Sequence, residues 1–280
     1  MQYTAPTELD EALARLASDA PTILAGGTDF YPARVGLPLT EHVLDISRLA
    51  ALDGIERSSD GSYRIGALTS WADITNADLP PRFDGLRRAA ARVGGVQVQN
   101  AATIGGNLCN ASPAADGVPA LLTLDASVEL VSVHGARILS VGEFITGYRQ
   151  TARRPDELVT AILVPSDLDD AVSTFLKLGS RRYLVISIAM VAALVAGGDD
   201  GTVRHARVAI GACSPVAQRA LTLESDLVGR PIDRDLALVV TADHLSMLDP
   251  IDDIRASASY RRGAALTLVR RALLELGNQS

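Results

Sequence analysis

Residues 102–116 read ATIGGNLCNASPAAD, and a stretch of similar character, ILAGGTDF, occupies residues 23–30. Each stretch contains a glycine pair, Gly26-Gly27 or Gly105-Gly106, with apolar residues before it and small polar residues after it. Successive backbone N–H groups in a glycine turn can point into one concavity and bind an anion, and the absent side chains allow close approach. Each pair is therefore either an ordinary turn, which is the commoner case for one pair alone, or part of a phosphate cradle.

The charges around the second stretch indicate which anion it could hold. No Lys or Arg occurs between Arg92 and Arg137, so we expect backbone dipoles, rather than a nearby basic side chain, to neutralise it. The motifs GxxxxGK and GxGxxG are both absent, which disfavours a nucleoside triphosphate site and the common dinucleotide fold. The residues alone thus point to a pyrophosphate ligand outside both common nucleotide folds.

Composition limits the class of protein further. The chain has 280 residues, 48% of them hydrophobic, with a formal net charge of -7 and a pI near 5.1. An acidic chain without a basic stripe argues against nucleic acid or an anionic membrane as partner. The longest apolar run, residues 184–196, is too short to span a bilayer, and the N-terminus lacks the pattern of a signal peptide. We therefore expect no membrane span and a cytoplasmic location.

Side chains that could hold a metal ion are few and scattered. Cys109 and Cys213 do not form a CxxC pair, and no histidine is spaced from another candidate ligand as a metal site requires. We expect no metal site and no iron–sulfur cluster in this chain. Cys109 is interpreted as small and unreactive.

Local patterns predict a mixed α+β chain. Thr7 is placed to cap a helix whose apolar residues recur at helical spacing as far as Pro21. Further helices are expected over residues 71–78, 81–93 and 118–124, and strands over residues 22–25, 42–45, 62–68, 127–133 and 157–165.

The acidic stretch SDLDDA, residues 166–171, is typical of an exposed connector and predicts a boundary between two domains, residues 1–168 and 171–280. The second domain contains apolar runs at residues 173–178, 184–196 and 202–212, which predict a three-stranded antiparallel sheet. It ends in a helix, with Gly277 at a position typical of a C-terminal stop.

The two glycine stretches together closely resemble the FAD-binding, or medium, subunit of the molybdenum hydroxylases, the xanthine dehydrogenase and carbon monoxide dehydrogenase family. The continuation VPALLTLDA and the segments ELVTAILVP and FLKLGSRR extend the resemblance over nearly the whole chain. The resemblance implies an FAD-binding domain of the PCMH/vanillyl-alcohol-oxidase type with two α+β subdomains, about residues 1–55 and 56–168. A C-terminal domain of a three-stranded antiparallel sheet with helices would follow.

The resemblance also assigns site residues. A first glycine loop, residues 23–30, and a second glycine loop, residues 103–107, would wrap the FAD pyrophosphate, with further contacts from the second domain and from the segments around the loops. The cofactor-binding residues implied are Ile23, Leu24, Ala25, Gly26, Gly27, Thr28, Asp29, Phe30, Val93, Thr103, Ile104, Gly105, Gly106, Asn107, Asn110, Asp116, Val159 and Lys177.

Several of these residues have a structural alternative. Asp116 could accept hydrogen bonds from sugar or ribityl hydroxyls, or cap the helix at 118–124. Asp29 could cap a short helix near Phe30, and we expect its backbone to matter more than its carboxylate. Lys177, the only lysine, matches a flavin-contacting lysine of the family but could be a solvated strand residue.

Other residues have the same ambiguity. Thr28 and Thr103 could donate to phosphate or cap local turns. Val93 and Val159 could contact the cofactor or lie in the core.

The function implied is that of an FAD-carrying electron-transfer subunit, an oxidoreductase component without a catalytic side chain of its own. Partner chains would hold the [2Fe-2S] clusters and the molybdopterin, as a small and a large subunit, in a complex that could be a dimer of heterotrimers. One alternative is a self-contained flavin reductase resembling enolpyruvyl-glucosamine reductase, in which the polar cluster Arg181, Arg182 and Tyr183 could act. Another is a binding protein whose loops have lost FAD.

Overall fold

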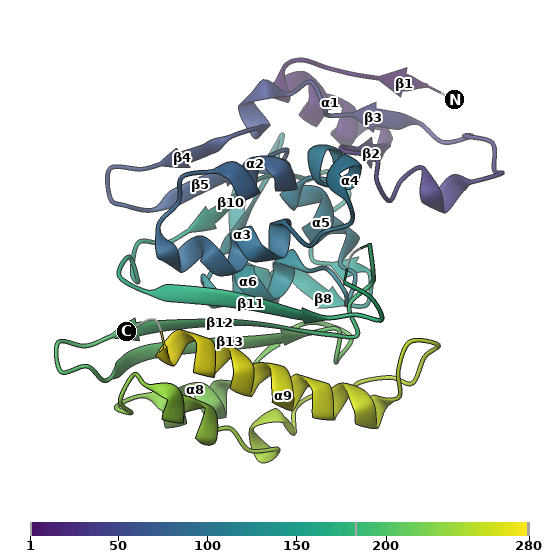
Figure 1. Cartoon of the computed structure of the whole chain (residues 1–280). Coiled ribbons are helices and arrows are strands. Elements are labelled where there is room, and N and C mark those ends of the chain that lie inside the picture. The colour runs from purple at the N-terminus through teal and green to yellow at the C-terminus, as the bar shows by residue number, and fades with distance from the viewer. Residues whose placement is uncertain (1, 183, 279–280) are drawn as a thin grey trace.

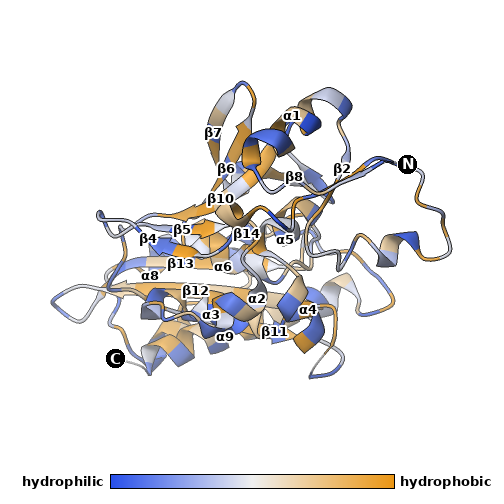
Figure 2. Cartoon of the chain, turned by 90° about the horizontal axis from the view of Figure 1, so that it is seen from above, coloured by the Kyte–Doolittle hydropathy of each residue, from blue (hydrophilic) through white to orange (hydrophobic). Residues whose placement is uncertain are grey.

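The computed structural model describes residues 2–182 and 184–278, and its sheets and helices are stacked in layers (Figure 1). A small N-terminal sheet lies at one end, a five-stranded sheet with its helices in the middle, and the C-terminal sheet and helices at the other end. Hydrophobic residues concentrate on the strands, as Figure 2 shows for β5, β6 and β10. Among the described helices, none has both the length and the apolar character needed to cross a membrane.

The N-terminal layer consists of three short parallel strands and one helix. The sheet order is β1 (Tyr3–Thr4), β3 (Val43–Asp45), β2 (Thr22–Leu24), and α1 (Leu9–Asp19) packs on it. The expected cap at Thr7 is wrong. The N-cap is Glu8, whose side chain makes no capping bond, while acidic residues in the first turn favour the positive end of the helix dipole.

The middle layer is an antiparallel sheet with the order β4 (Ile55–Arg57), β5 (Tyr63–Gly66), β10 (Leu158–Val164), β6 (Ser127–Ser132), β7 (Gly135–Ser140). Its helices are α2 (Trp71–Asn76), α3 (Asp84–Ala90), α4 (Val96–Ala101), α5 (Ile104–Asn110), α6 (Gly117–Thr123) and α7 (Val141–Phe144). A hairpin of β8 (Ile145–Gly147) and β9 (Gln150–Thr151) follows α7. The strands expected over residues 62–68, 127–133 and 157–165 are confirmed.

Short 3-10 helices lie between the strands and α-helices. They are η1 (Pro32–Arg34), η2 (Ala50–Leu52), η3 (Pro81–Phe83), η4 (Arg234–Leu238) and η5 (Asp243–Leu245).

The C-terminal sheet has the order β11 (Val172–Leu178), β12 (Ala189–Gly197), β13 (Val203–Gly211), β14 (Gln218–Arg219), all antiparallel. The prediction of three strands missed β14, which has two residues and no apolar run. The predicted strand at 184–196 begins too early, because Leu184 has a left-handed φ of 50° and the ladder starts only at Ala189.

The C-terminal sheet joins the middle layer to the last helices. Alternate residues of β12 belong to two cores: Ala192 and Leu194 pack with the middle layer, whereas Ala193 and Val195 pack with α8 (Leu221–Leu227) and α9 (Ala258–Gly277). Gly277 is the last residue of α9 rather than a left-handed stop. A Cβ there would lie 2.0 Å from the Asp233 carbonyl oxygen, so close packing explains this glycine.

Candidate functional site

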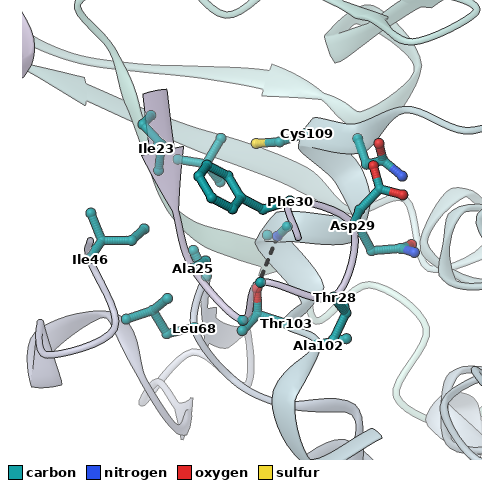
Figure 3. Close-up of a pocket in the computed structure, with 18 of the residues that line it drawn as sticks. Ile23, Ala25, Thr28, Asp29, Phe30, Ile46, Leu68, Ala102, Thr103 and Cys109 are labelled. Carbon is teal, nitrogen blue, oxygen red and sulfur yellow. Dashed lines mark hydrogen bonds between the residues drawn. The ribbon is translucent and has the colours of Figure 1, made fainter. Parts of the chain in front are cut away.

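The two glycine loops meet at one cavity. A Cβ on Gly26 would lie 1.7 Å from the carbonyl oxygen of Ala101, which lies two residues before the start of the second glycine loop at Thr103. A cavity of about 670 Å³, here called the main cavity, is lined by both loops. Segments about 80 residues apart in the sequence therefore face the same space (Figure 3).

The first glycine loop leaves backbone donors unpaired. It leaves β2 after Leu24, and Gly27 takes a left-handed φ of 73° that a side chain would strain. Within the described part of the chain, no atom accepts a hydrogen bond from the N–H groups of residues 26–29. Four consecutive N–H groups at the edge of a cavity are suited to an anion.

The second glycine loop uses its N–H groups inside the protein. The Ile104 N–H donates to the Thr69 carbonyl (3.0 Å), and the Gly105 N–H donates to the Ala67 carbonyl (2.9 Å). Thr103 is the N-cap of α5, and its Oγ1 accepts from the Gly106 N–H at 3.1 Å (Figure 3). The capping alternative for Thr103 is thus confirmed, and its own hydroxyl proton is not used in that bond.

The glycines of the second loop are explained mainly by packing. A Cβ on Gly105 would lie 2.7 Å from both the Cβ and the carbonyl oxygen of Ala67. A Cβ on Gly106 would approach only Thr103 Oγ1, at 2.9 Å, because that side of the residue faces the cavity. The backbone N–H groups of the two glycine pairs are thus used differently, although both pairs line the main cavity.

Arginines reach the cavity from elsewhere in the sequence. Arg34 and Arg153 line it, and Arg34 lies over the Phe30 ring with its guanidinium carbon 3.8 Å from the ring centre. Arg149 donates to Asp29 Oδ2 (3.2 Å) and to Asn110 Oδ1 (2.8 Å). The expectation that no basic side chain lies near is wrong, because it considered only neighbours along the chain.

Asp29 does not cap a helix. The nearest helical turn, η1, has Tyr31 as its N-cap with no side-chain bond, and the Asp29 carboxylate is paired with Arg149 instead. The hydrogen bond to Asp29 raises the pKa of Arg149, so the guanidinium keeps its charge beside the carboxylate.

Apolar side chains line another part of the main cavity. They come from β2 and the residue after it, from the segments around β3, β5 and α4, and from β10. These side chains are Ile23, Ala25, Ile46, Leu68, Val93, Val98, Leu158 and Val159. The cavity thus has a polar part at the first loop and an apolar part that suits a flat ring or a base.

Cys109 of α5 also opens onto the main cavity (Figure 3). Desolvation by the neighbouring protein atoms raises the pKa of its thiol to about 11. The thiol is therefore protonated and weakly nucleophilic at neutral pH.

A side cavity of about 410 Å³ adjoins the main one and shares Asp29, Val93, Val98 and Asn107 with it. Its polar group is a buried pair: Lys177 Nζ lies 2.6 Å from Asp116 Oδ2, and the two side chains are only 6% and 7% exposed. Lys177 also donates to the Arg92 carbonyl (3.2 Å), and Ser187 Oγ donates to Asp116 Oδ1 (2.6 Å).

These contacts exclude the structural alternatives given above, a helix cap for Asp116 and a solvated strand residue for Lys177. Asp116 has helical backbone angles and makes no capping bond, so it is not the side-chain cap of α6. Lys177 is not a solvated strand residue. Burial raises the pKa of the Asp116 carboxyl, although the Lys177 ammonium and the Ser187 hydroxyl both stabilise its charged form.

One buried acceptor remains without a partner at the junction of the two cavities. Asn107 Oδ1 has no hydrogen-bond partner among the described residues and is closed to solvent. A buried amide oxygen without a donor is destabilising, so a ligand donor at this position would relieve that cost. Unpaired N–H donors, an unpaired acceptor and an apolar slot fit a nucleotide cofactor that has a pyrophosphate and a flat ring.

Comparison with known families names that cofactor. Residues 1–167 match the family described as "FAD binding domain in molybdopterin dehydrogenase". The chain belongs to this family. Residues 174–276 match the family described as "CO dehydrogenase flavoprotein C-terminal domain", and the α+β fold expected from the sequence is confirmed.

Individual relatives agree over the full length. The glyceraldehyde dehydrogenase medium chain of Sulfolobus acidocaldarius is 32% identical over 98% of this chain and 97% of its own length. The nicotinate dehydrogenase FAD-subunit of Eubacterium barkeri is 34% identical over 99% of this chain and 96% of its own. In the solved carbon monoxide dehydrogenase of Hydrogenophaga pseudoflava, a chain 28% identical superposes with a TM-score of 0.89, covering 100% of this chain and 97% of that one.

Most residues expected to contact FAD line the main cavity. They are Ile23, Ala25, Gly26, Gly27, Thr28, Asp29, Phe30, Val93, Thr103, Gly105, Gly106, Asn107, Asn110 and Val159. Leu24 and Ile104 instead point into the core, where 5% and 0% of their surface is exposed, and Asp116 and Lys177 line the side cavity. Arg34, Arg149, Arg153 and Ser187 were missed, because no local motif marks them.

Proposed function

We propose that this chain binds one FAD in the main cavity and passes electrons from the [2Fe-2S] clusters of a partner subunit, through that FAD, to an external acceptor. The observation that supports this best is the row of unpaired N–H groups at residues 26–29, on a cavity shared with the second glycine loop. The flavin, when bound, supplies the chemistry of taking up and releasing electrons singly or in pairs.

Each part of the site has a proposed role. The N–H groups of residues 26–29 bind the pyrophosphate, and the free hydroxyl proton of Thr103 donates to one of its oxygens. Asn107 Oδ1 accepts a hydrogen bond from the cofactor. Val93 and Val159 exclude water beside it.

Lys177 has an electrostatic role in this proposal. Its ammonium is held by Asp116 and the Arg92 carbonyl at the side cavity, which shares four residues with the main one. Because Asp116 compensates much of this charge, the pair favours a negatively charged, reduced flavin only through an orientation that puts the ammonium nearer to the flavin than the carboxylate. No side chain acts as acid, base or nucleophile.

The partners are also proposed. The relatives are named as a medium chain and as an FAD-subunit of dehydrogenases, which supports a complex with a small [2Fe-2S] subunit and a large molybdopterin subunit. We propose a dimer of heterotrimers in the cytoplasm. The division at residues 1–168 and 171–280 is proposed as well, and family matches on either side of the connector support it.

The first experiment identifies the cofactor and partners. The full chain is purified from cells that produce it at native level, its absorption spectrum is recorded, and the released cofactor is weighed by mass spectrometry. We expect FAD in equimolar amount and copurification of an iron–sulfur and a molybdenum subunit. A colourless chain that does not take up added FAD would contradict the proposal, and NADPH turnover by the chain alone would instead favour a self-contained reductase.

A further inference from the structure

We propose that Arg149 is a positioning residue of the FAD cradle, which neutralises Asp29 beside the pyrophosphate and ties the first glycine loop to the end of α5. This inference rests on the proposed function, because it concerns the same cavity. Arg149 is not among the residues that line the main cavity, whereas Asp29 and Asn110 are, so it acts through them.

The backbone at Arg149 is unusual. Arg149 lies in the two-residue turn of the β8–β9 hairpin and has a left-handed φ of 52°, a conformation in which glycine or asparagine is less strained than arginine. Its N–H donates to the Ala111 carbonyl at 3.0 Å, next to Asn110. The turn is thereby fixed against the C-terminus of α5.

The side chain hydrogen-bonds to two segments that both line the main cavity. Its Nη1 lies 2.8 Å from Asn110 Oδ1 and 3.2 Å from Asp29 Oδ2. One arginine thus connects the β8–β9 turn, the end of α5 and the first glycine loop.

The charge of this arginine matters because of what the first loop binds. The Asp29 N–H belongs to the row of unpaired donors, so its carboxylate sits on the same short loop as the proposed phosphates. The Asp29 carboxylate and the phosphates are both negatively charged and would repel each other. A cation paired with the carboxylate reduces this repulsion. The two arginines that line the main cavity are engaged elsewhere: Arg34 is paired with Glu41, and Arg153 donates to the Glu157 carbonyl. Arg149 is the arginine paired with Asp29.

The size of the effect is limited by solvent. The Arg149 and Asp29 side chains are 49% and 55% exposed, so water screens their interaction. We therefore expect Arg149→Gln to weaken FAD binding to the full chain by about three- to tenfold. Asp29→Asn is expected to tighten binding slightly, and the double variant to recover most of what Arg149→Gln loses.

A second variant separates this role from a structural one. Arg149→Gly suits the left-handed turn, so the melting temperature of the FAD-free chain should stay the same or rise, while FAD affinity falls as in Arg149→Gln. If Arg149 only held the hairpin in place, FAD affinity would fall only where the melting temperature also falls, and Arg149→Gly would bind FAD like the wild type.

The matched control is the exposed pair Arg204–Asp170, 2.6 Å apart with side chains 44% and 57% exposed, away from both cavities. Arg204→Gln should leave FAD affinity unchanged in a fluorescence titration. The inference is overturned if Arg149→Gln binds FAD like the wild type, or if adding Asp29→Asn restores nothing. A wild-type chain that binds no FAD would instead overturn the proposed function itself.

Discussion

The two glycine loops look alike in sequence and differ in what their backbones do. Among the residues that the structure describes, the N–H groups of residues 26–29 have no acceptor, whereas Ile104 and Gly105 donate theirs to carbonyls of the 67–69 segment. The glycines also serve different neighbours: Gly26 makes room for the Ala101 carbonyl, and Gly105 makes room for Ala67. A glycine pair therefore indicates close approach, but not whether a ligand or the protein itself approaches.

Because of this difference, the two loops have different roles in the site. The first loop provides the donors, and the second loop places α5 and the Thr103 hydroxyl against the same cavity. Loss of the N–H donors of the first loop should affect cofactor binding directly, whereas substitution of the glycines in the second loop should act through the position of α5.

The largest effect is expected for Gly26→Ala. The new Cβ would lie 1.7 Å from a backbone oxygen, so the two loops must separate. We expect no detectable FAD binding, and a loss of unfolding free energy above about 3 kcal/mol, measured by denaturant unfolding. Wild-type FAD affinity in this variant would show that the loops need not touch.

Gly105→Ala comes next. Alanine is the better helix former, but its Cβ would lie 2.7 Å from Ala67, and this overpacking should lower the unfolding free energy by about 1–3 kcal/mol. FAD affinity should fall only as far as α5 is displaced. The control is Gly142→Ala in α7, where nothing lies within 4 Å of the new Cβ and stability should be equal or higher. Equal losses in both variants would refute the packing explanation.

Thr103→Val is a smaller change that keeps the shape and removes the hydroxyl. Loss of the N-cap should lower the unfolding free energy by about 1 kcal/mol. Loss of the phosphate donor should weaken FAD binding roughly tenfold in a fluorescence titration, since hydrogen bonds to charged groups are stronger than neutral ones. Thr103→Ser retains the hydroxyl and should recover both, so a Ser variant as weak as Val would rule out the donor role.

The sequence predicted the fold well where patterns are local and long. Strands β6 and β10 lie where alternating or continuous apolar runs placed them, whereas β14 escaped because two residues form no pattern. The glycine loops were found from composition and resemblance. The unequal use of their N–H groups was not, because it depends on the 67–69 carbonyls, which only the folded chain brings near.

Charged partners were the least predictable part of the site. Arg149 lies 120 residues from Asp29 in the sequence, and Ser187 lies 71 residues from Asp116. No spacing rule connects such pairs. Local context offered a helix cap as the alternative to cofactor contact for Asp116, but tertiary contacts with Lys177 and Ser187 determine its environment instead.

The smallest effect is expected in a test that changes neither loop and uses the labelling rate of Cys109 to report on the cavity that both loops line. Its thiol pKa of about 11 lies above the tested range, so the thiolate fraction, and with it the rate of iodoacetamide labelling, should rise about tenfold per pH unit from pH 7 to 9. The measurement uses a Cys213→Ser variant, and a Cys109→Ser variant, which retains the buried Cys213, should stay unlabelled while folded. Because Cys109 belongs to α5 and opens onto the main cavity, FAD bound by the first loop should slow its labelling. Rapid labelling at pH 7 would contradict the desolvated thiol, and unchanged labelling in saturating FAD would place the cofactor outside the cavity that both loops line.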